Sequence, residues 1–152
     1  MIKADSFTRM DAFFHILDNY KLDKSLISYA FKEAYIDSDN LFKHKLRIKE
    51  LLANSKIDLR QLMSRNEREI LNTLPNRVKI YRGMTISEKE SDDFGISWTL
   101  DQERAAFFVF KYQRNYSTDQ LKKTVHQLEV RKEDILALFN DREEIEIIYL
   151  HN

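Results

Sequence analysis

Apolar residues recur at steps of three and four along the first half of the chain, as they do on one face of an amphipathic helix. The pattern predicts a first helix capped by Asp5 or Ser6, a second over residues 25–35 and a third over residues 40–54. The residues expected to face a core in the first and third helices are Phe7, Met10, Phe13, Phe14, Leu17, Leu41, Leu46, Leu51 and Leu52.

A fourth helix is predicted by a local hydrogen-bonding pattern rather than by periodicity. Ser64 and Glu67 have the spacing of a capping box, in which each side chain bonds the other residue's backbone amide at a helix start. The only proline, Pro75, stands where the helical pattern stops, so this helix should end near Leu74.

After Pro75 the pattern changes to the alternation and β-branching that strands favour. The strand over residues 78–81 should end at Arg82. The later elements are expected to be a loop over residues 84–94, a short strand over 95–99, a helix capped by Thr99 with Gln102 in capping-box spacing, a loop over 111–123, a strand over 124–130, a helix over 132–139 and a strand over 143–150. On the helix after Thr99, the buried face would be Ala105, Phe108, Val109 and Tyr112.

This order of helices followed by strands predicts an α+β fold. The 152 residues fit one domain, 1–152, with a helical part over 1–74 and a β-rich part over 75–152. Neither part is long enough to bury a stable core easily on its own. Ten Phe and seven Tyr supply large pieces for the core.

Composition excludes several classes of function. The 25 basic and 25 acidic residues balance, which argues against broad electrostatic capture of nucleic acid or membrane. The absence of cysteine excludes disulfides, thiolate metal sites and cysteine nucleophiles, and favours a cytoplasmic protein. No long apolar run indicates a membrane anchor, and the four histidines lack metal-site spacing. The basic stretch 43–49 is either a nucleic-acid contact or a solvated helix face.

The chain contains only two glycines, Gly83 and Gly95, and each stands next to polar residues that suit a binding site. Arg82 would bring a forked cationic donor beside the bare backbone of Gly83, where a phosphate or ribose can be held. The alternative is a surface arginine before an ordinary turn.

Two carboxylates, Glu144 and Glu146, are separated by one residue near the C-terminus. In a strand both would point to one face, where either can bond a sugar hydroxyl or stabilise a developing positive charge. The alternative is an exposed edge strand with charged outer positions. In the same way, Ser97 and Thr99 would point one way and Trp98 the other, which makes Trp98 a core or wall residue.

Taken together in this order, Tyr81-Arg82-Gly83, Ser97-Trp98-Thr99 and Glu144-Ile145-Glu146 resemble the R-S-E class of mono-ADP-ribosyltransferases. The resemblance covers roughly residues 74–150 and is closest to bacterial and phage members of the arginine-specific type, whose acidic motif is Glu-x-Glu. The chain departs from the family's common Ser-Thr-Ser motif at Trp98 and Thr99.

The resemblance implies a split two-sheet β core, NAD as co-substrate, no metal, and transfer of ADP-ribose to a macromolecular acceptor. Arg82 would bind the NAD phosphates and ribose, and the Gly83 backbone would hold the nicotinamide amide. Ser97 would brace the ribose and the catalytic Glu146, while Glu144 would orient or deprotonate the acceptor. Thr99 and Phe108 are further cofactor-binding candidates, although core packing is an alternative for Phe108.

The resemblance leaves the biological role open. Protein arginine is the favoured acceptor and nucleic acid is possible, in a toxin of a toxin–antitoxin system, with an antitoxin or inhibitor as partner, or in a phage host modifier. Two alternatives remain, namely an NAD glycohydrolase that uses water as acceptor and a non-catalytic binding module with the same fold.

Overall fold

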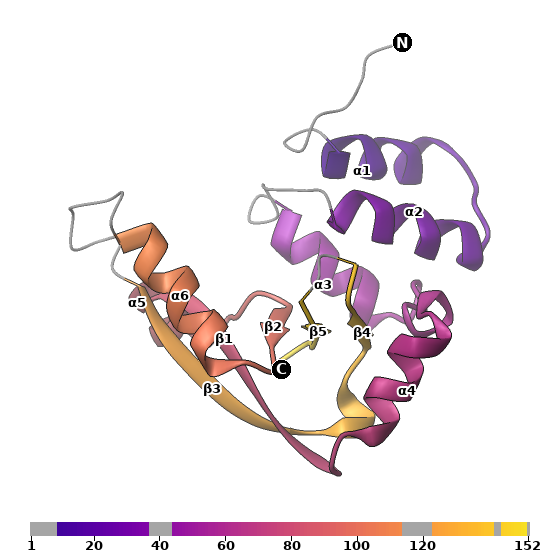
Figure 1. Ribbon diagram of the computed structural model, residues 1–152. Helices are drawn as coiled ribbons and strands as arrows, with labels where there is room; N and C mark the ends of the chain where they lie inside the picture. Colours follow the sequence, from indigo (N-terminus) through magenta and orange to yellow (C-terminus); the bar gives the residue numbers. More distant parts are fainter. Residues whose placement is uncertain (1–8, 37–43, 114–122, 142–143, 152) are drawn as a thin grey trace. The chain divides into compact units, whose positions relative to one another are not determined.

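The computed structural model describes residues 9–36, 44–113, 123–141 and 144–151 (Figure 1). The chain divides into two compact units, Met1–Leu62 and Met63–Asn152, and each is described by itself. The single domain over 1–152 stays a prediction.

The first unit is helical, with α1 (Arg9–Asn19), α2 (Lys24–Ile36), α3 (Lys45–Ala53) and the 3-10 turn η2 (Arg60–Leu62). Its core contains the residues Met10, Phe13, Phe14, Phe31, Tyr35, Ile48, Leu51 and Leu52. The predicted core position Leu46 is wrong, because its side chain is 73% exposed while Ile48 is buried instead. The predicted cap and the positions Phe7 and Leu41 lie outside the described residues.

Part of the basic stretch fastens α3 to α1 within this unit. Arg47 donates to both carboxylate oxygens of Asp18, at 2.7 and 3.2 Å, and its guanidinium lies 4.2 Å from the ring centre of Phe14. His44 Nε2 lies 2.6 Å from Asp11 Oδ1. These two basic residues are therefore engaged by acidic groups of the same unit.

In the second unit, α4 (Arg65–Thr73) begins with the predicted capping box, which is confirmed. Glu67 N donates to Ser64 Oγ at 3.1 Å, and Ser64 N donates to Glu67 Oε1 at 2.8 Å. The second carboxylate oxygen of Glu67 accepts a 2.7 Å bond from Asn140 N. This buried carboxylate thus ties the helix start to a segment far along the chain.

The strands are β1 (Arg77–Thr85), β2 (Ser97–Thr99), β3 (Lys123–Arg131), β4 (Ala137–Phe139) and β5 (Glu146–Ile148). They form one antiparallel sheet in the order β3-β1-β2-β5-β4, which confirms the α+β class. β1 and β3 pair over nine residues, from Arg77–Arg131 to Thr85–Lys123, whereas β1 and β2 share the single pair Tyr81–Thr99. The sheet therefore has a narrow junction at Tyr81.

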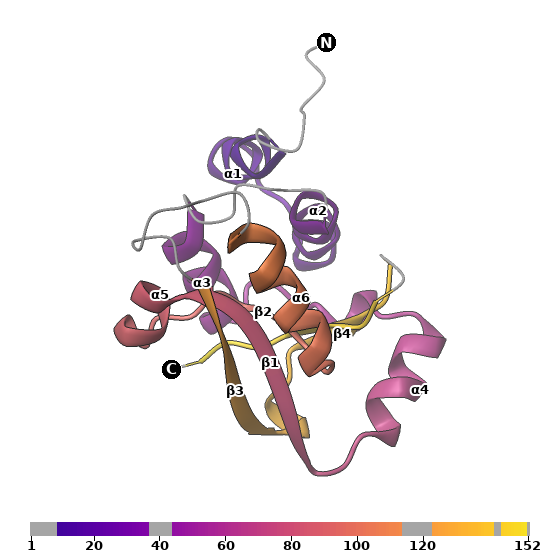
Figure 2. The same cartoon turned by 60° about the vertical axis from the view of Figure 1, so that its left-hand side comes forward.

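Helix α6 (Gln102–Gln113) follows β2 and packs on β1 and β3 (Figure 2). The predicted cap is wrong by two residues. Asp101 Oδ1 accepts bonds from the backbone amides of Glu103 and Arg104, while Thr99 Oγ1 accepts from Asp101 N. Ala105 is buried, as expected; the side chains of Phe108 and Tyr112 lie outside the described part.

Three other expectations about the β-rich part are corrected. The expected loop over 84–94 contains helix α5 (Ile86–Ser91), capped by Thr85, whose hydroxyl accepts from Glu88 N. The expected helix over 132–139 is a 3-10 turn, η4 (Lys132–Asp134), followed by β4, because Ala137–Phe139 are buried and pair with β5. The expected strand over 143–150 is confined to Glu146–Ile148.

Candidate functional site

A cavity of about 360 Å³ lies within the second unit, at the narrow junction of the sheet. Its lining combines three segments that are distant in sequence with the first turns of α6: Tyr81, Arg82, Gly83, Ser97, Trp98, Thr99, Arg104, Ala105, Phe107, Glu144, Ile145 and Glu146. The structure therefore brings together the three motif segments singled out in the sequence.

Ser97 and Glu146 are joined directly across neighbouring strands. Ser97 Oγ donates to Glu146 Oε2 at 2.6 Å, a short bond of the kind that a carboxylate accepts from a hydroxyl. Thr99 stands opposite Glu146 in the register, so Ser97 is its diagonal neighbour on the same face. The alternation also turns Trp98 to the other face, where it is 2% exposed and its Nε1 donates to Gly95 O at 3.1 Å. The prediction of Trp98 as a core or wall residue is confirmed.

Arg82 is held by a residue that the sequence reasoning did not single out. Glu88, on α5, accepts from Arg82 Nε at 2.7 Å and from Nη2 at 3.2 Å. The remaining terminal nitrogen, Nη1, donates to Ser97 O at 3.0 Å. The pair is largely buried, with side chains 24% and 16% exposed. Arg82 therefore connects β1, α5 and β2, and it does not end its strand, since β1 continues to Thr85.

Gly95 is required by this arrangement. A Cβ placed on Gly95 would lie 2.7 Å from Cζ of Arg82, closer than real Cβ contacts come, and 3.2 Å from Nε, a tight contact, so the guanidinium would have to move. Gly95 N also donates to Glu88 Oε2 at 3.3 Å. Neither described glycine has a positive φ, and Gly83 pairs with Val125 inside β1. The close approach of the Arg82 guanidinium explains why position 95 is a glycine. Neither glycine is explained by a turn that needs a positive φ.

Glu144 also lines the cavity, but strand alternation does not place it there. It lies in a bend before β5, and its carboxylate Oε2 contacts Arg104 Nε on α6. Both side chains are partly exposed, Arg104 at 50% and Glu144 at 43%. The two carboxylates therefore reach the same cavity from different kinds of backbone, and Glu144 already has a cationic partner.

The two remaining cofactor-binding candidates have different outcomes. Thr99 lines the cavity and pairs with Tyr81 and Glu146, while its hydroxyl accepts from Asp101 N at 3.1 Å. The side chain of Phe108 lies outside the described part, whereas its neighbour Phe107 lines the cavity and is 60% exposed. An aromatic ring at this wall is therefore supplied by Phe107.

Two basic residues near Arg82 have lowered pKa values. The pKa of Lys123 is lowered, first by burial and then by the nearby charge of Arg82. Burial also lowers the pKa of His126, which stands opposite Arg82 in the β1–β3 pairing, and the charge of Lys89 adds to the effect. Neither residue lines the cavity, whose charged lining residues are Arg82, Arg104, Glu144 and Glu146.

Two site residues, Glu88 and Arg104, were missed from the sequence. A signal existed for Glu88, because Thr85 and Glu88 have the same spacing as Ser64 and Glu67, and Thr85 does cap α5. A helix start there would have brought Glu88 close to Arg82. No local pattern indicated Arg104, whose partner lies far along the chain.

Comparisons with protein-family models, with curated proteins and with solved structures found no match. Within the described ranges, no group of three or more His, Cys, Asp or Glu residues is arranged to hold a metal ion. In those same ranges, the helices are all too short or too polar to cross a membrane.

Proposed function

We propose that the protein is a mono-ADP-ribosyltransferase, which cleaves NAD and transfers ADP-ribose to a macromolecular acceptor. The observation that carries the proposal is the 2.6 Å bond from Ser97 to Glu146, in a cavity that Arg82 and Glu144 also line. The volume of about 360 Å³ lies within the range of ligand pockets, about 300–1,000 Å³.

The chemistry needs a negative group that is fixed in place. When the bond between nicotinamide and ribose breaks, its electron pair leaves with nicotinamide and positive charge develops on the ribose. Glu146, oriented by Ser97, would stabilise that charge, as carboxylates do in glycosidases. The acceptor then bonds to the ribose carbon and gives up a proton, for which Glu144 is the available base at the cavity.

Arg82 would hold the NAD phosphates through those N–H donors of its guanidinium that the contacts with Glu88 and Ser97 do not use. Of the five N–H donors of an arginine, three are used on Glu88 and on Ser97 O in the contacts described above. The other two, on Nη1 and Nη2, are the donors that we assign to the ligand. Because Glu88 and Ser97 O fix the plane of the group, binding would cost little side-chain entropy.

The same proposal covers the finer fold. The sheet narrows to the single pair Tyr81–Thr99 between the β3-β1 part and the β2-β5-β4 part. Such a junction supports a split core of the ADP-ribosyltransferase type, with the cavity at the split.

The decisive variant is Glu146→Gln, which keeps the shape and removes the charge. We expect wild-type protein to release nicotinamide from NAD, and the variant to lose about 10²- to 10³-fold in kcat, the usual loss for one transition-state stabilising group. Glu129→Gln, on the exposed side of β3, is the matched control and should behave as wild type. The proposal fails if wild-type protein with NAD and cell lysate releases no nicotinamide. Calorimetry showing no NAD binding would then favour the non-catalytic binding module.

The acceptor is identified in the same reaction with labelled NAD. Label on protein that survives nuclease supports a protein acceptor, label on RNA or DNA supports nucleic acid, and release of free ADP-ribose alone supports an NAD glycohydrolase. For a role as a toxin or a phage host modifier, expression of the wild type should arrest host growth and Glu146→Gln should relieve it. Equal toxicity of the two forms would exclude that role.

A further inference from the structure

The Arg104–Glu144 pair lies at the cavity, where a substrate group would have to compete with it. Both residues line the cavity, and both side chains are about half exposed. The carboxylate that the proposed function assigns to the acceptor is thus already bound to a guanidinium from the same chain.

Arg104 lies near the start of its helix. Its backbone amide bonds to the cap Asp101, so Arg104 stands in the first turn of α6. A positive side chain there faces the positive end of the helix dipole, which disfavours it. The helix dipole therefore does not stabilise Arg104, and the opposite charge that it contacts is Glu144.

The exposure of the pair makes it exchangeable. Ion pairs between exposed side chains contribute little to stability, since water screens the charges and both side chains lose rotamer freedom. By contrast, the pair of Arg82 with Glu88 is 24% and 16% exposed and has two N–H donors on one carboxylate. A ligand would displace Arg104 from Glu144 far more easily than Glu88 from Arg82.

We propose that Arg104 is a specificity-determining residue: its guanidinium occupies Glu144 until an acceptor that carries its own guanidinium displaces it. The inference rests on the proposed function, because only that function makes the guanidinium compound an acceptor. The contact between Arg104 and Glu144 does not depend on that function. Neutral acceptors gain nothing from the exchange, because they leave Glu144 without a cation. Acceptors with a guanidinium restore the pair and release Arg104 to solvent.

The test measures binding and transfer separately, on the full chain, with methylguanidine as the probe. Binding is followed without NAD through the backbone amide signals of Ile145 and Glu146, which line the cavity beside Glu144. Arg104→Gln should bind methylguanidine about two- to fivefold more tightly, the factor that an exposed pair of up to ~1 kcal/mol allows. Arg104→Lys keeps the cation and should stay near wild type. Adding Glu144→Gln to Arg104→Gln should abolish the gain.

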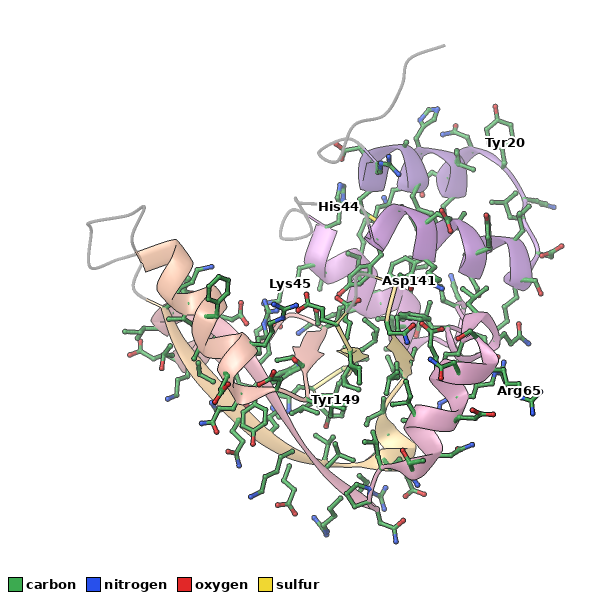
Figure 3. All side chains as sticks on the ribbon, in the orientation of Figure 1. Tyr20, His44, Lys45, Arg65, Asp141 and Tyr149 are labelled. Atoms are coloured by element: carbon green, nitrogen blue, oxygen red, sulfur yellow. The ribbon has the colours of Figure 1, made fainter. Side chains whose placement is uncertain are left out.

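With NAD present, kcat/KM for methylguanidine should rise in Arg104→Gln by a similar factor. Arg65→Gln is the matched control, because Arg65 also stands at a helix start, pairs with Glu69 and extends into solvent at 94% exposure (Figure 3). It should alter neither readout.

Equal or weaker methylguanidine binding in Arg104→Gln overturns the inference, even if the enzyme consumes NAD. A gain in binding without any consumption of NAD by wild type overturns the proposed function instead, and leaves a guanidinium site at Glu144. A gain in binding combined with a loss of transfer would make Arg104 a group that supports the reaction, which also overturns the inference.

Discussion

Two charged groups of the cavity, Arg82 and Glu144, each face an opposite charge from elsewhere in the second unit. The pairs differ in burial, and burial decides their behaviour, because an ion pair that is largely withdrawn from water is screened less than an exposed one. Arg82 is therefore a fixed group in a fixed orientation. Glu144 is a group whose partner can change.

Glu88→Gln tests whether the orientation of Arg82 matters for the ligand. The amide keeps one acceptor oxygen but directs an NH2 group at a donor of Arg82 or Gly95, so the guanidinium should lose its defined plane. We expect KM for NAD to rise about tenfold, equivalent to ~1.4 kcal/mol, with a smaller change in kcat. Stability should fall by about 1–2 kcal/mol.

Steady-state kinetics and urea denaturation measure these two effects separately. Glu90→Gln on the same helix is the control, because its side chain is exposed. A variant of Glu88 that is less stable but has an unchanged KM for NAD would show that the pair only holds the fold together.

At the scale of elements, the sequence predicted what short-range contacts decide. The capping box of Ser64 and Glu67 was predictable because both partners lie three residues apart, and the strand at Ser97–Thr99 followed from local alternation. The extent of β5 could not be predicted in this way, since its three residues are defined by pairing with β2 and β4. The order of the motifs along the sequence indicated which segments belong to the site. These segments do line one cavity, but that observation does not test the catalytic and binding roles predicted for their residues.

The partners of the motif residues were beyond such reasoning. Arg104 meets Glu144 only because α6 and the segment before β5 converge in space. The same holds for Glu67, whose capping role was local and predictable while its bond to Asn140 N was not. Tertiary contacts of this kind depend on the fold, so no spacing in the sequence reports them.

Glu67→Gln is the prediction that belongs to this scale, because one carboxylate serves two elements. Oε1 accepts from Ser64 N and Oε2 from Asn140 N, and the residue is 2% exposed. Glutamine has one acceptor oxygen, so one of the two backbone N–H groups would face an NH2 donor. We expect a loss of about 1–3 kcal/mol in the free energy of unfolding, the cost of a buried unsatisfied donor, measured by urea denaturation.

The control for this change is Glu69→Gln, two residues along the same helix, with an exposed side chain. Its effect should stay within about 0.5 kcal/mol, as is usual at the surface. If the two variants are equally stable, the bond between Glu67 and Asn140 contributes nothing to the fold.

For the whole molecule, the 25 basic and 25 acidic residues balance. The four histidines are the side chains that ordinarily titrate between pH ~5 and ~8. Among them, His126 has a lowered pKa. Its ring lies 4.9 Å from that of Phe94 and 6.4 Å from that of Trp98, and burial is the main cause of the shift. Lys89 and His151 lower it further, while Asp92 opposes them.

This shift predicts that acid weakens the folded state through His126. Since the folded chain binds the proton less well than the unfolded chain, the stability that His126 contributes is present above the ordinary value of 6.5 and is lost as pH falls through the folded pKa. Urea denaturation at pH ~8, ~6.5 and ~5 should therefore show wild type losing stability towards acid more steeply than His126→Gln, which is neutral throughout. At high pH the variant should be less stable than wild type, because the substitution removes the ring that packs on Phe94. The difference in stability between the two proteins should shrink as pH falls. Parallel curves for the two proteins would mean that the His126 ring is protonated as easily in the folded chain as in the unfolded one, in conflict with its place against Phe94 and Trp98.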